Sequence, residues 1–267
     1  MNNLIKRTLT GIAFVGLVVG AILLSGWVLF AVFLLFTCLG MHEYRTLLRQ
    51  GNVNLSLTFY VVGLLVYLTL SITPLWEMVG VMAIMALLFM LFVIELFLKQ
   101  GLPFRNIAYS VLGILWIVVP FAVVNRFPPS EGRFLLLSVF VFIWLYDTFA
   151  YCVGMLIGNH RLFERISPKK SWEGAIGSTL FTLTAAYFAP LMFPMLELNS
   201  LQWMGLALVI IVFGTFGDLT ESLFKRQSSV KDSGSILPGH GGILDRFDSL
   251  LFAMPFVLLY LSLIVNC

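Results

Sequence analysis

Two carboxylates lie inside strongly apolar segments of this sequence. Asp147 stands in FIWLYDTFAYCVG, and Asp218 stands in VFGTFGDLTESLFKR. An ionised carboxylate is costly in hydrocarbon, so such residues usually face a wet cavity and have a partner. A Lys or Arg at the end of each segment is one such partner. Glu221 follows Asp218 at a spacing that shares its helix face, which favours a cation bound by several acids.

Two further acids, Asp245 and Asp248, begin the last apolar segment in LDRFDSLLF. Their spacing places them on one helix face at an N-terminus, where they also complement the helix dipole. Asp218 and Asp245 together suit Mg²⁺, which takes one or two carboxylates along with water and substrate phosphates. We therefore predict Asp218 and Asp245 as metal ligands, with Asp147 and Asp248 as secondary candidates.

The glycine-rich segment LPGHGGILD precedes these acids. Gly241 and Gly242 follow His240 there, and glycines allow a backbone to turn its amides toward an anion before a helix begins. Glycine and proline are also common in ordinary connecting loops. The nearby cations favour phosphate binding, because they supply donors for phosphate oxygens. These cations are Lys225, Arg226, Lys231 and Arg246.

A second polar loop, RISPKKSWEGAIGS, carries hydroxyl and ammonium groups at the start of another apolar segment. These groups belong to Ser167, Lys169, Lys170 and Ser171. Part of the positive charge follows from the general excess of Lys and Arg in cytoplasmic loops and from attraction to anionic lipid. For this loop taken alone, substrate binding is therefore the second explanation.

Helices that cross a membrane must position these residues. Hydrophobic residues make up 60% of the 267 and charged residues 11%, which excludes a soluble globule, because no compact domain can bury so much apolar surface. We predict an all-α, polytopic integral membrane protein with about nine transmembrane helices, each of about 20 apolar residues. The apolar segments lie at about 8–25, 27–47, 53–72, 75–98, 106–125, 133–156, 173–193, 202–224 and 246–265.

Residues 1–267 are expected to form a single transmembrane domain, with the most specific catalytic region at 147–248. The first two segments meet at Ser25 and Gly26, which predicts a tight helical hairpin. The longest polar stretches, at about 157–172 and 225–245, are expected to be connections between helices.

The Lys and Arg residues predict the orientation of the segments. If the N-terminus is cytoplasmic, alternate connections place all of the 16 Lys and Arg residues except Arg126 and Arg133 on the cytoplasmic side. Both long polar loops then face the cytoplasm, where a soluble nucleotide can reach them. We therefore expect a multi-pass protein of the inner (cytoplasmic) membrane, with its N-terminus and its active site on the cytoplasmic side.

One pattern extends from Ser222 to Asp248 and reads S-x-x-K-R-x-x-x-x-K-D-x-x-x-x-x-P-x-H-G-G-x-x-D-R-x-D. It resembles the signature of the phosphatidate cytidylyltransferases, also called CDP-diacylglycerol synthases. The segments DTFAYCVG and SPKKSWEG extend the resemblance, and the length and hydropathy are similar to those of the bacterial members. Ser171 stands where Thr is more common in that family, a change that keeps the hydroxyl. The resemblance covers most of the chain and is most specific in its last third.

The resemblance implies an enzyme that joins CTP and phosphatidic acid to give CDP-diacylglycerol and pyrophosphate. It implies a requirement for Mg²⁺ and leaves a second cation open. The expected partners are the two substrates and the lipid bilayer, with no nucleic acid, and a homodimer is left open. Because the phosphate of phosphatidic acid is already an anionic nucleophile, alignment and charge neutralisation are the main catalytic tasks.

The resemblance also assigns roles to residues. The implied catalytic residues are Asp218, Lys225, Arg226 and Asp245. The implied substrate-binding residues are Ser167, Lys169, Lys170, Ser171, Lys231, Asp232, His240, Gly241, Gly242 and Arg246.

Two other functions use similar features. A membrane lipid kinase that uses CTP would also need a metal, a nucleotide and a lipid acceptor, but it would release CDP instead of pyrophosphate. A secondary transporter could use intramembrane acids as ion sites, although transporters often show inverted repeats and broken helices near the bilayer midplane. Here the polar residues concentrate toward one face and one end of the chain, which favours an enzyme.

Overall fold

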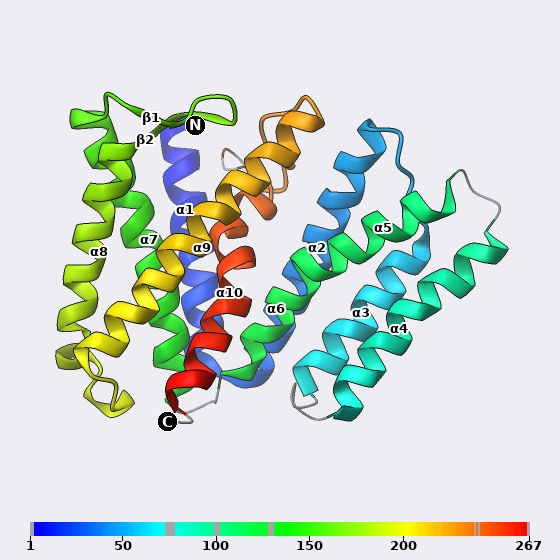
Figure 1. The fold of residues 1–267 in the computed structure, drawn as a ribbon, viewed down its shortest axis with the longest axis horizontal. Helices are drawn as coiled ribbons and strands as arrows, with labels where there is room; N and C mark the ends of the chain where they lie inside the picture. The colour runs from blue at the N-terminus through cyan, green and yellow to red at the C-terminus, as the bar shows by residue number, and fades with distance from the viewer. Residues whose placement is uncertain are drawn as a thin grey trace. The chain divides into compact units, whose positions relative to one another are not determined.

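The computed structural model describes residues 3–72, 78–98, 102–127, 131–237, 239 and 241–265. Within these ranges the chain is mainly helical (Figure 1). The helices are α1 (Asn3–Leu24), α2 (Gly26–Gln50), α3 (Leu57–Ile72), α4 (Met78–Phe97), α5 (Pro103–Gly113), α6 (Val119–Val123), α7 (Gly132–Ile157), α8 (Trp172–Met192), α9 (Ser200–Gln227) and α10 (Leu244–Val265).

In the described part of the chain, each apolar segment predicted from the sequence coincides with helix, and the ends differ by a few residues. Ser25 alone separates α1 from α2, as the predicted hairpin requires. Its hydroxyl accepts a hydrogen bond from the Val28 amide, with an N···O distance of 3.2 Å, and so caps α2.

One predicted segment is a helical stretch with an irregular middle. A π-helical turn, Ile114–Val118, joins α5 to α6, and a 3-10 turn, Val124–Arg126, ends the stretch. The π-helical turn lies just before Pro120, whose ring cannot fit a regular α-helical turn and which has no amide hydrogen to donate. The irregularity therefore has a local cause in the sequence.

The helices have the length and surface of membrane spans. Seven helical stretches in the described ranges are long and apolar enough to cross a bilayer, with Pro103–Arg126, which contains α5 and α6, counted as one. The apolar helices Thr8–Leu24 and Leu57–Ile72 are shorter. Large apolar side chains point outward, for example Trp27, Leu96 and Phe97, which are 82%, 81% and 80% exposed. Such a surface requires lipid around it. The chain is a multi-pass membrane protein, and the count of nine crossings stays a prediction.

The polar loop expected at about 157–172 contains structure that the sequence reasoning missed. Strands β1 (Arg161–Phe163) and β2 (Ser167–Ser171) form an antiparallel two-stranded sheet, in which Arg161 pairs with Ser171 and Phe163 with Ser167. Strands this short show no period-2 pattern from which to predict them. Their ladder satisfies the backbone groups of the loop.

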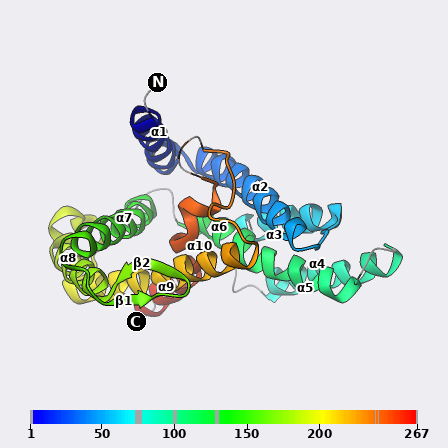
Figure 2. The same ribbon diagram turned by 90° about the horizontal axis from the view of Figure 1, so that it is seen from above.

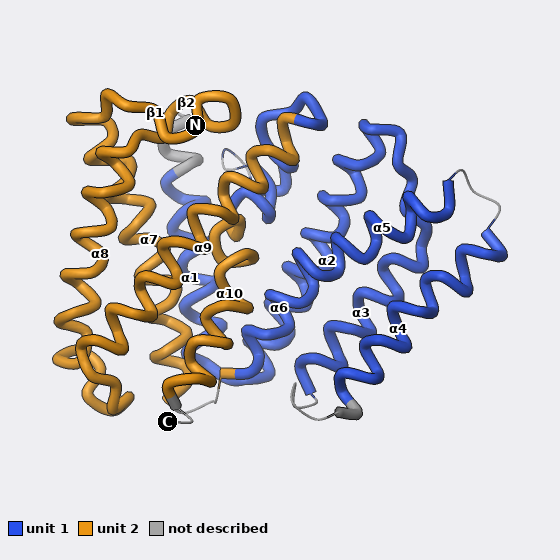
Figure 3. The backbone as a smooth tube through the Cα atoms, viewed as in Figure 1, with its two compact units in different colours: residues 1–126, 227–246 blue, residues 127–226, 247–267 orange. Residues whose placement is uncertain are grey.

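Two compact units divide the chain (Figure 3): unit 1 comprises residues 1–126 and 227–246, and unit 2 comprises residues 127–226 and 247–267. Unit 1 has an aromatic core, in which the rings of Phe33 and Phe121 meet edge to face at 5.7 Å. The hydroxyls of its buried Tyr44 and Tyr67 donate to backbone carbonyls. In unit 2, α7 and α8 lie side by side (Figures 1 and 2).

Candidate active site

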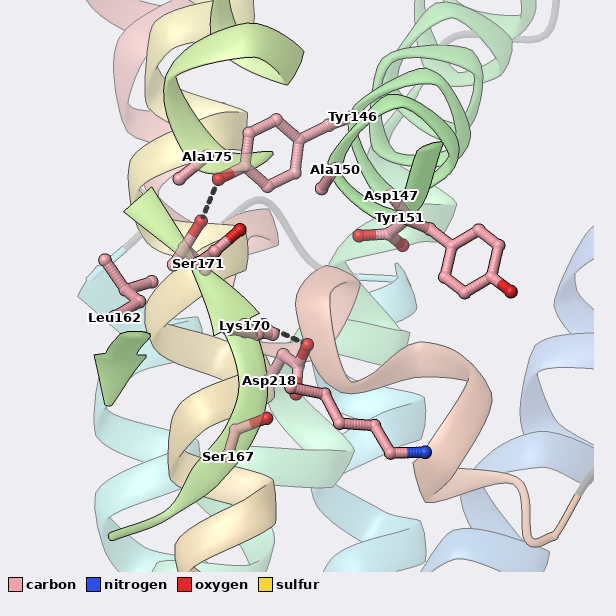
Figure 4. Close-up of a pocket in the computed structure, with 12 residues that line it drawn as sticks. Tyr146, Asp147, Ala150, Tyr151, Leu162, Ser167, Lys170, Ser171, Ala175 and Asp218 are labelled. Atoms are coloured by element: carbon pink, nitrogen blue, oxygen red, sulfur yellow. Dashed lines mark hydrogen bonds and ion pairs between the residues drawn. The ribbon is translucent and has the colours of Figure 1, made fainter. Parts of the chain in front are cut away.

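Unit 2 contains a cavity of about 320 Å³ at α7, α8, α9 and β2 (Figure 4). Six of the predicted site residues line it: Asp147, Ser167, Lys169, Lys170, Ser171 and Asp218. The other lining residues are Tyr146, Ala150, Tyr151, Leu162, Ala175 and Thr215. The SPKKS loop and the two intramembrane acids, which the sequence suggested separately, therefore meet in one place.

Glycines at the α7–α8 crossing bring β2 against this cavity. A Cβ added to Gly174 would stand 2.8 Å from the carbonyl oxygen of Ala150 and 3.2 Å from Cα of Gly154. Two helices can approach this closely only where side chains are absent. Ser171, the last residue of β2, caps α8 by accepting a hydrogen bond from the Gly174 amide at 3.2 Å.

A second contact fixes the other strand of the hairpin. Nδ1 of His160 lies 2.5 Å from Oε1 of Glu173, in the first turn of α8, and the His160 amide donates to the same carboxylate. The Trp172 amide in turn donates to the His160 carbonyl at 2.9 Å. Both ends of the hairpin are thus tied to the start of α8.

Asp218 has a lysine partner from this hairpin. Nζ of Lys170 forms an ion pair with Oδ2 of Asp218 (Figure 4), and the two side chains are 28% and 25% exposed. Oδ1 of Asp218 accepts a hydrogen bond from the Ser222 hydroxyl at 3.3 Å. An acid within a membrane helix thus has the cationic partner that its burial demands.

Gly217, the residue before Asp218, lets α10 lie directly against α9. A Cβ at this position would stand 2.5 Å from the carbonyl oxygen of Asp248 and 2.7 Å from Cβ of Phe252. Any larger residue would therefore push the two helices apart. The close approach brings Asp248 to the neighbourhood of Asp218.

Three of the four predicted acids gather in this part of unit 2. Asp248 interacts electrostatically with Asp218, Asp147 and Lys170. Its Oδ1 also accepts a hydrogen bond from the Ser249 amide at 2.7 Å. Carboxylates from α7, α9 and α10 and a lysine from β2 thus lie near enough for their charges to interact.

Two hydroxyls at the cavity were missed in the sequence. The Thr215 hydroxyl donates to Oη of Tyr146 at 3.0 Å, and both residues line the cavity. Tyr146 is adjacent to Asp147, and Thr215 lies one turn before Asp218 on the same helix face. Hydroxyl groups at these spacings from intramembrane acids were the signal that could have identified them.

In unit 1, the loop with the glycine-rich segment folds around the carboxylate of Glu43, from α2. Oε1 accepts a hydrogen bond from the Ile243 amide at 2.8 Å, and Oε2 accepts from the Leu244 amide and the Ser233 hydroxyl, each at 3.0 Å. Glu43 is only 2% exposed, and a Cβ on Gly242 would collide with it. Glu43 therefore satisfies the first amides of α10. The sequence reasoning missed it, although a carboxylate inside the apolar segment 27–47 was a signal.

Asp245, in the first turn of α10, binds back to the same loop. Its Oδ2 accepts hydrogen bonds from the amides of Ser233 and Gly242, at 2.8 and 2.7 Å. The same oxygen lies 3.0 Å from the Ser233 hydroxyl, whose single hydrogen is shared between Asp245 and Glu43. Gly239 and Gly241 have φ angles of 78° and 81°, which favour glycine. The Gly242 amide, expected to face a phosphate, thus has a carboxylate as its acceptor here. Metal binding by Asp245 and phosphate binding by the turn stay predictions.

The remaining predicted residues have different environments. Nζ of Lys225 lies 2.5 Å from Oε2 of Glu221, in a buried ion pair whose side chains are 12% and 1% exposed. His240 lies outside the described residues. The others are exposed to solvent or lipid: Arg226, Lys231, Asp232 and Arg246.

A family model extends over nearly all of these elements. The model of the cytidylyltransferase family matches residues 5–264. The chain belongs to the cytidylyltransferase family. The resemblance that the Ser222–Asp248 pattern suggested is confirmed.

Several cytidylyltransferases with the name phosphatidate cytidylyltransferase are similar to this chain. The one from Staphylococcus aureus (strain COL) is 33% identical over 250 residues, which are 93% of this chain and 95% of that protein. The one from Staphylococcus epidermidis is 35% identical over 256 residues, with the same coverage of 93% and 95%. The one from Staphylococcus saprophyticus is 40% identical over 176 residues, 65% of this chain and 66% of that protein.

For a cytidylyltransferase, the unit 2 cavity has suitable chemistry. Lys169 and Lys170 can neutralise phosphate oxygens, and carboxylates are the oxygen ligands that Mg²⁺ prefers. Among the described residues, no three acidic, His or Cys side chains are placed to form a complete metal site. A cation at Asp218 would therefore need ligands from water or substrate phosphates, which is the usual coordination of Mg²⁺.

Proposed function

We propose that this protein is a phosphatidate cytidylyltransferase, which makes CDP-diacylglycerol and pyrophosphate from CTP and phosphatidic acid. Family membership supports this activity, as do similar proteins of that name that align with 93% of the chain. The activity is assigned to particular residues by the unit 2 cavity, where Lys170 of the SPKKS strand forms an ion pair with Asp218. A lysine and a carboxylate from segments that are distant in the sequence thus line the same cavity.

In the reaction, a phosphate oxygen of phosphatidic acid attacks the α-phosphorus of CTP. A new P–O bond forms, and the bond between the α-phosphorus and the oxygen that bridges to the β-phosphorus breaks, so pyrophosphate leaves with the electron pair. The nucleophile is already an anion, so no proton must be removed. The protein must instead hold two anions together and offset the charge that develops on the leaving group.

The residues of unit 2 divide these tasks. Lys169 and Lys170 neutralise phosphate oxygens, and Lys170 exchanges Asp218 for a phosphate when substrate binds. The hydroxyls of Ser167 and Ser171 lie in the same cavity and can hydrogen-bond to phosphate. The lipid tails of phosphatidic acid can stay in the bilayer while its head group enters this cavity.

Asp218 would hold Mg²⁺, with Asp147 and Asp248 as further candidate ligands in unit 2, and Asp245 in unit 1 stays a ligand predicted from the sequence. The cation, when bound, supplies positive charge to the phosphates of CTP. Asp147 and Asp218 line one cavity, so carboxylate oxygens are available there, and water and substrate phosphates would supply the remaining ligands of Mg²⁺. The residues after Asp218 in the signature would bind the nucleotide phosphates: Lys225, Arg226, Lys231, Asp232, His240, Gly241, Gly242 and Arg246.

The orientation belongs to this proposal as well. Nine crossings with a cytoplasmic N-terminus place both signature loops in the cytoplasm, where CTP is available. Phosphatidic acid reaches the site from the surrounding bilayer of the inner membrane.

The decisive test is a pyrophosphate-release assay with purified protein, CTP, phosphatidic acid and Mg²⁺. We expect pyrophosphate only when all three are present, together with an equal amount of CDP-diacylglycerol. Pyrophosphate formed without phosphatidic acid would contradict the proposed acceptor. Release of CDP together with a phosphorylated lipid would identify a lipid kinase, and solute uptake by reconstituted protein without CTP use would identify a transporter.

A further inference from the structure

A second polar cavity lies within unit 1, and the predicted site residues do not line it. Its volume is about 740 Å³. It is formed where α2 ends, α3 begins, α4 ends and α5 begins, and Figure 1 shows these four ends toward the same edge of unit 1. Three of its lining residues are arginines: Arg45, Arg49 and Arg105.

The three arginines bring positive charge to this cavity. In the part of the chain that the structure describes, no carboxylate forms an ion pair with any of the three guanidinium groups. Glu95 of α4 is 5% exposed, and it accepts a hydrogen bond from Nδ2 of Asn106 at 2.7 Å. Three like charges around one cavity repel one another, whereas an anion bound in the cavity would attract all three guanidinium groups.

Two of the guanidinium groups are held in place by backbone carbonyls. Nε of Arg45 donates to the Leu55 carbonyl at 2.8 Å, and Cζ of Arg45 lies 5.4 Å from the centre of the Tyr60 ring. Nη2 of Arg105 donates to the Asn52 carbonyl at 2.5 Å. Each guanidinium has five N–H donors, so these contacts orient the groups and leave further donors for a ligand. Preorganised donors bind an anion at a lower entropic cost.

The lining also has an apolar part. Leu57, Leu98 and Leu102 line the same cavity, and Leu57 and Leu102 are 73% and 61% exposed. The excess of Lys and Arg in cytoplasmic loops accounts for the side of the membrane on which the arginines are expected, but not for their gathering around one cavity. Guanidinium groups next to exposed leucines match a ligand with a phosphate and an apolar portion.

We propose that this cavity binds the phosphate group of an anionic ligand. An anionic phospholipid would use both parts of the lining, because its headgroup phosphate would contact the arginines and its apolar portion the leucines. Arginine suits this role because its planar donors match phosphate oxygens in pairs. The binding does not depend on the proposed reaction, since none of the three arginines belongs to the site in unit 2.

The test uses Arg49, whose side chain makes no hydrogen bond or ion pair with the rest of the described chain. Purified full-length Arg49→Glu is compared with Arg165→Glu, an equal change of charge at an exposed residue between β1 and β2. The probe is labelled short-chain phosphatidylglycerol in equilibrium binding. Phosphatidylcholine is the comparison, because the charge of its phosphate is balanced by choline and its headgroup has no net charge. We expect Arg49→Glu to weaken phosphatidylglycerol binding about tenfold or more, which corresponds to about 1.4 kcal/mol. Arg165→Glu should bind it as the wild type does.

Inorganic phosphate separates the two sources of the anion. If it displaces phosphatidylglycerol from the wild type, or itself binds in a manner that requires Arg49, the phosphate group alone is sufficient. If it does neither while Arg49→Glu still loses phosphatidylglycerol, the lipid headgroup is the ligand. The proposal would be overturned if wild type and Arg49→Glu bound phosphatidylglycerol equally and bound inorganic phosphate equally. It would also be overturned if Arg165→Glu lost as much phosphatidylglycerol binding as Arg49→Glu. If Arg49→Glu does not fold, Arg49→Gln gives the same comparison with Arg165→Gln.

Discussion

Lys170 and Asp218 form an ion pair that is still partly exposed. Such a pair contributes little to stability, because solvent screens the charges and both side chains lose freedom when they pair. Lys170 can therefore leave Asp218 for a substrate phosphate at a small cost. Such a pair fits the proposed reaction, in which the charges of the site would be redistributed when CTP binds.

Asp218 is the first candidate for the metal ligand. We expect Asp218→Asn to reduce pyrophosphate release about 100-fold or more, because the neutral amide cannot supply the charge that a metal ligand provides. Ser222→Ala is the matched control, since it removes only the 3.3 Å hydrogen bond to Oδ1. Turnover of Asp218→Asn near that of the control would refute the metal assignment.

Glu43 should act on folding, because its carboxylate accepts three hydrogen bonds while almost fully buried. Glu43→Gln turns one oxygen into a donor that faces other donors, so we expect a loss of about 1–3 kcal/mol in the free energy of unfolding. Thermal unfolding in detergent measures this effect. Glu164→Gln, at an exposed turn between β1 and β2, should leave the midpoint unchanged. Equal midpoints for the two variants would show that Glu43 does not hold the loop.

At the scale of elements, glycines, which have no side chain, position the site as much as the polar residues do. Gly154 and Gly174 let α7 and α8 approach, and Gly217 does the same for α9 and α10. Lipid tails are as apolar as the helix surfaces, so membrane helices gain little from apolar burial and associate through close packing. In unit 2 the close approaches occur next to Ser171 and Asp218.

The α9–α10 approach can be tested at Gly217. Gly217→Ala places a methyl group against the Asp248 carbonyl, so we expect a destabilisation of about 1–3 kcal/mol and a fall in turnover as the acids move apart. Thermal unfolding and pyrophosphate release measure the two effects. Gly20→Ala is the control, because no atom lies within 4 Å of an added Cβ there. If Gly217→Ala behaved like Gly20→Ala, the contact would not position the site.

At the scale of the whole molecule, the exposed apolar side chains require lipid, but helix length alone does not settle the number of crossings. The apolar part of α1, Thr8–Leu24, and helix α3 are shorter than the seven long apolar stretches. Short helices can still span a bilayer that thins locally, and polar side chains that flank such a helix can extend to the interface. The positions of the loops are therefore the quantity to measure.

Single cysteines report the side of each loop. In a chain whose native cysteines are replaced by serine, we expect Gln50→Cys and Gln227→Cys to react with an impermeant thiol reagent only in inverted vesicles. Asn199→Cys should react in intact cells, because the exposed Asn199 lies in a connection predicted to be external. Activity of each variant serves as the control for folding. Labelling of all three positions from one side would be incompatible with nine crossings.

Much of the fold follows from local properties of the sequence. Apolar segments long enough for a bilayer occur where the helices occur, because a backbone in lipid must satisfy its hydrogen bonds within the segment. The acids at positions 147, 218 and 248 were predictable for a similar reason, since a carboxylate in an apolar segment has few roles. The Ser222–Asp248 pattern likewise predicted the family, because its spacing is contained in a single stretch of chain.

Only the tertiary structure decided which groups are partners. Lys170 pairs with Asp218, and Glu43 receives the amides that begin α10, across separations of 48 and about 200 residues. The arginines of the unit 1 cavity also come from separate helices. Composition and periodicity describe neighbours along the chain, whereas these contacts depend on how far apart the helices pack. That distance is set in part by glycines such as Gly217, whose effect on a remote carboxylate has no signal of its own in the sequence.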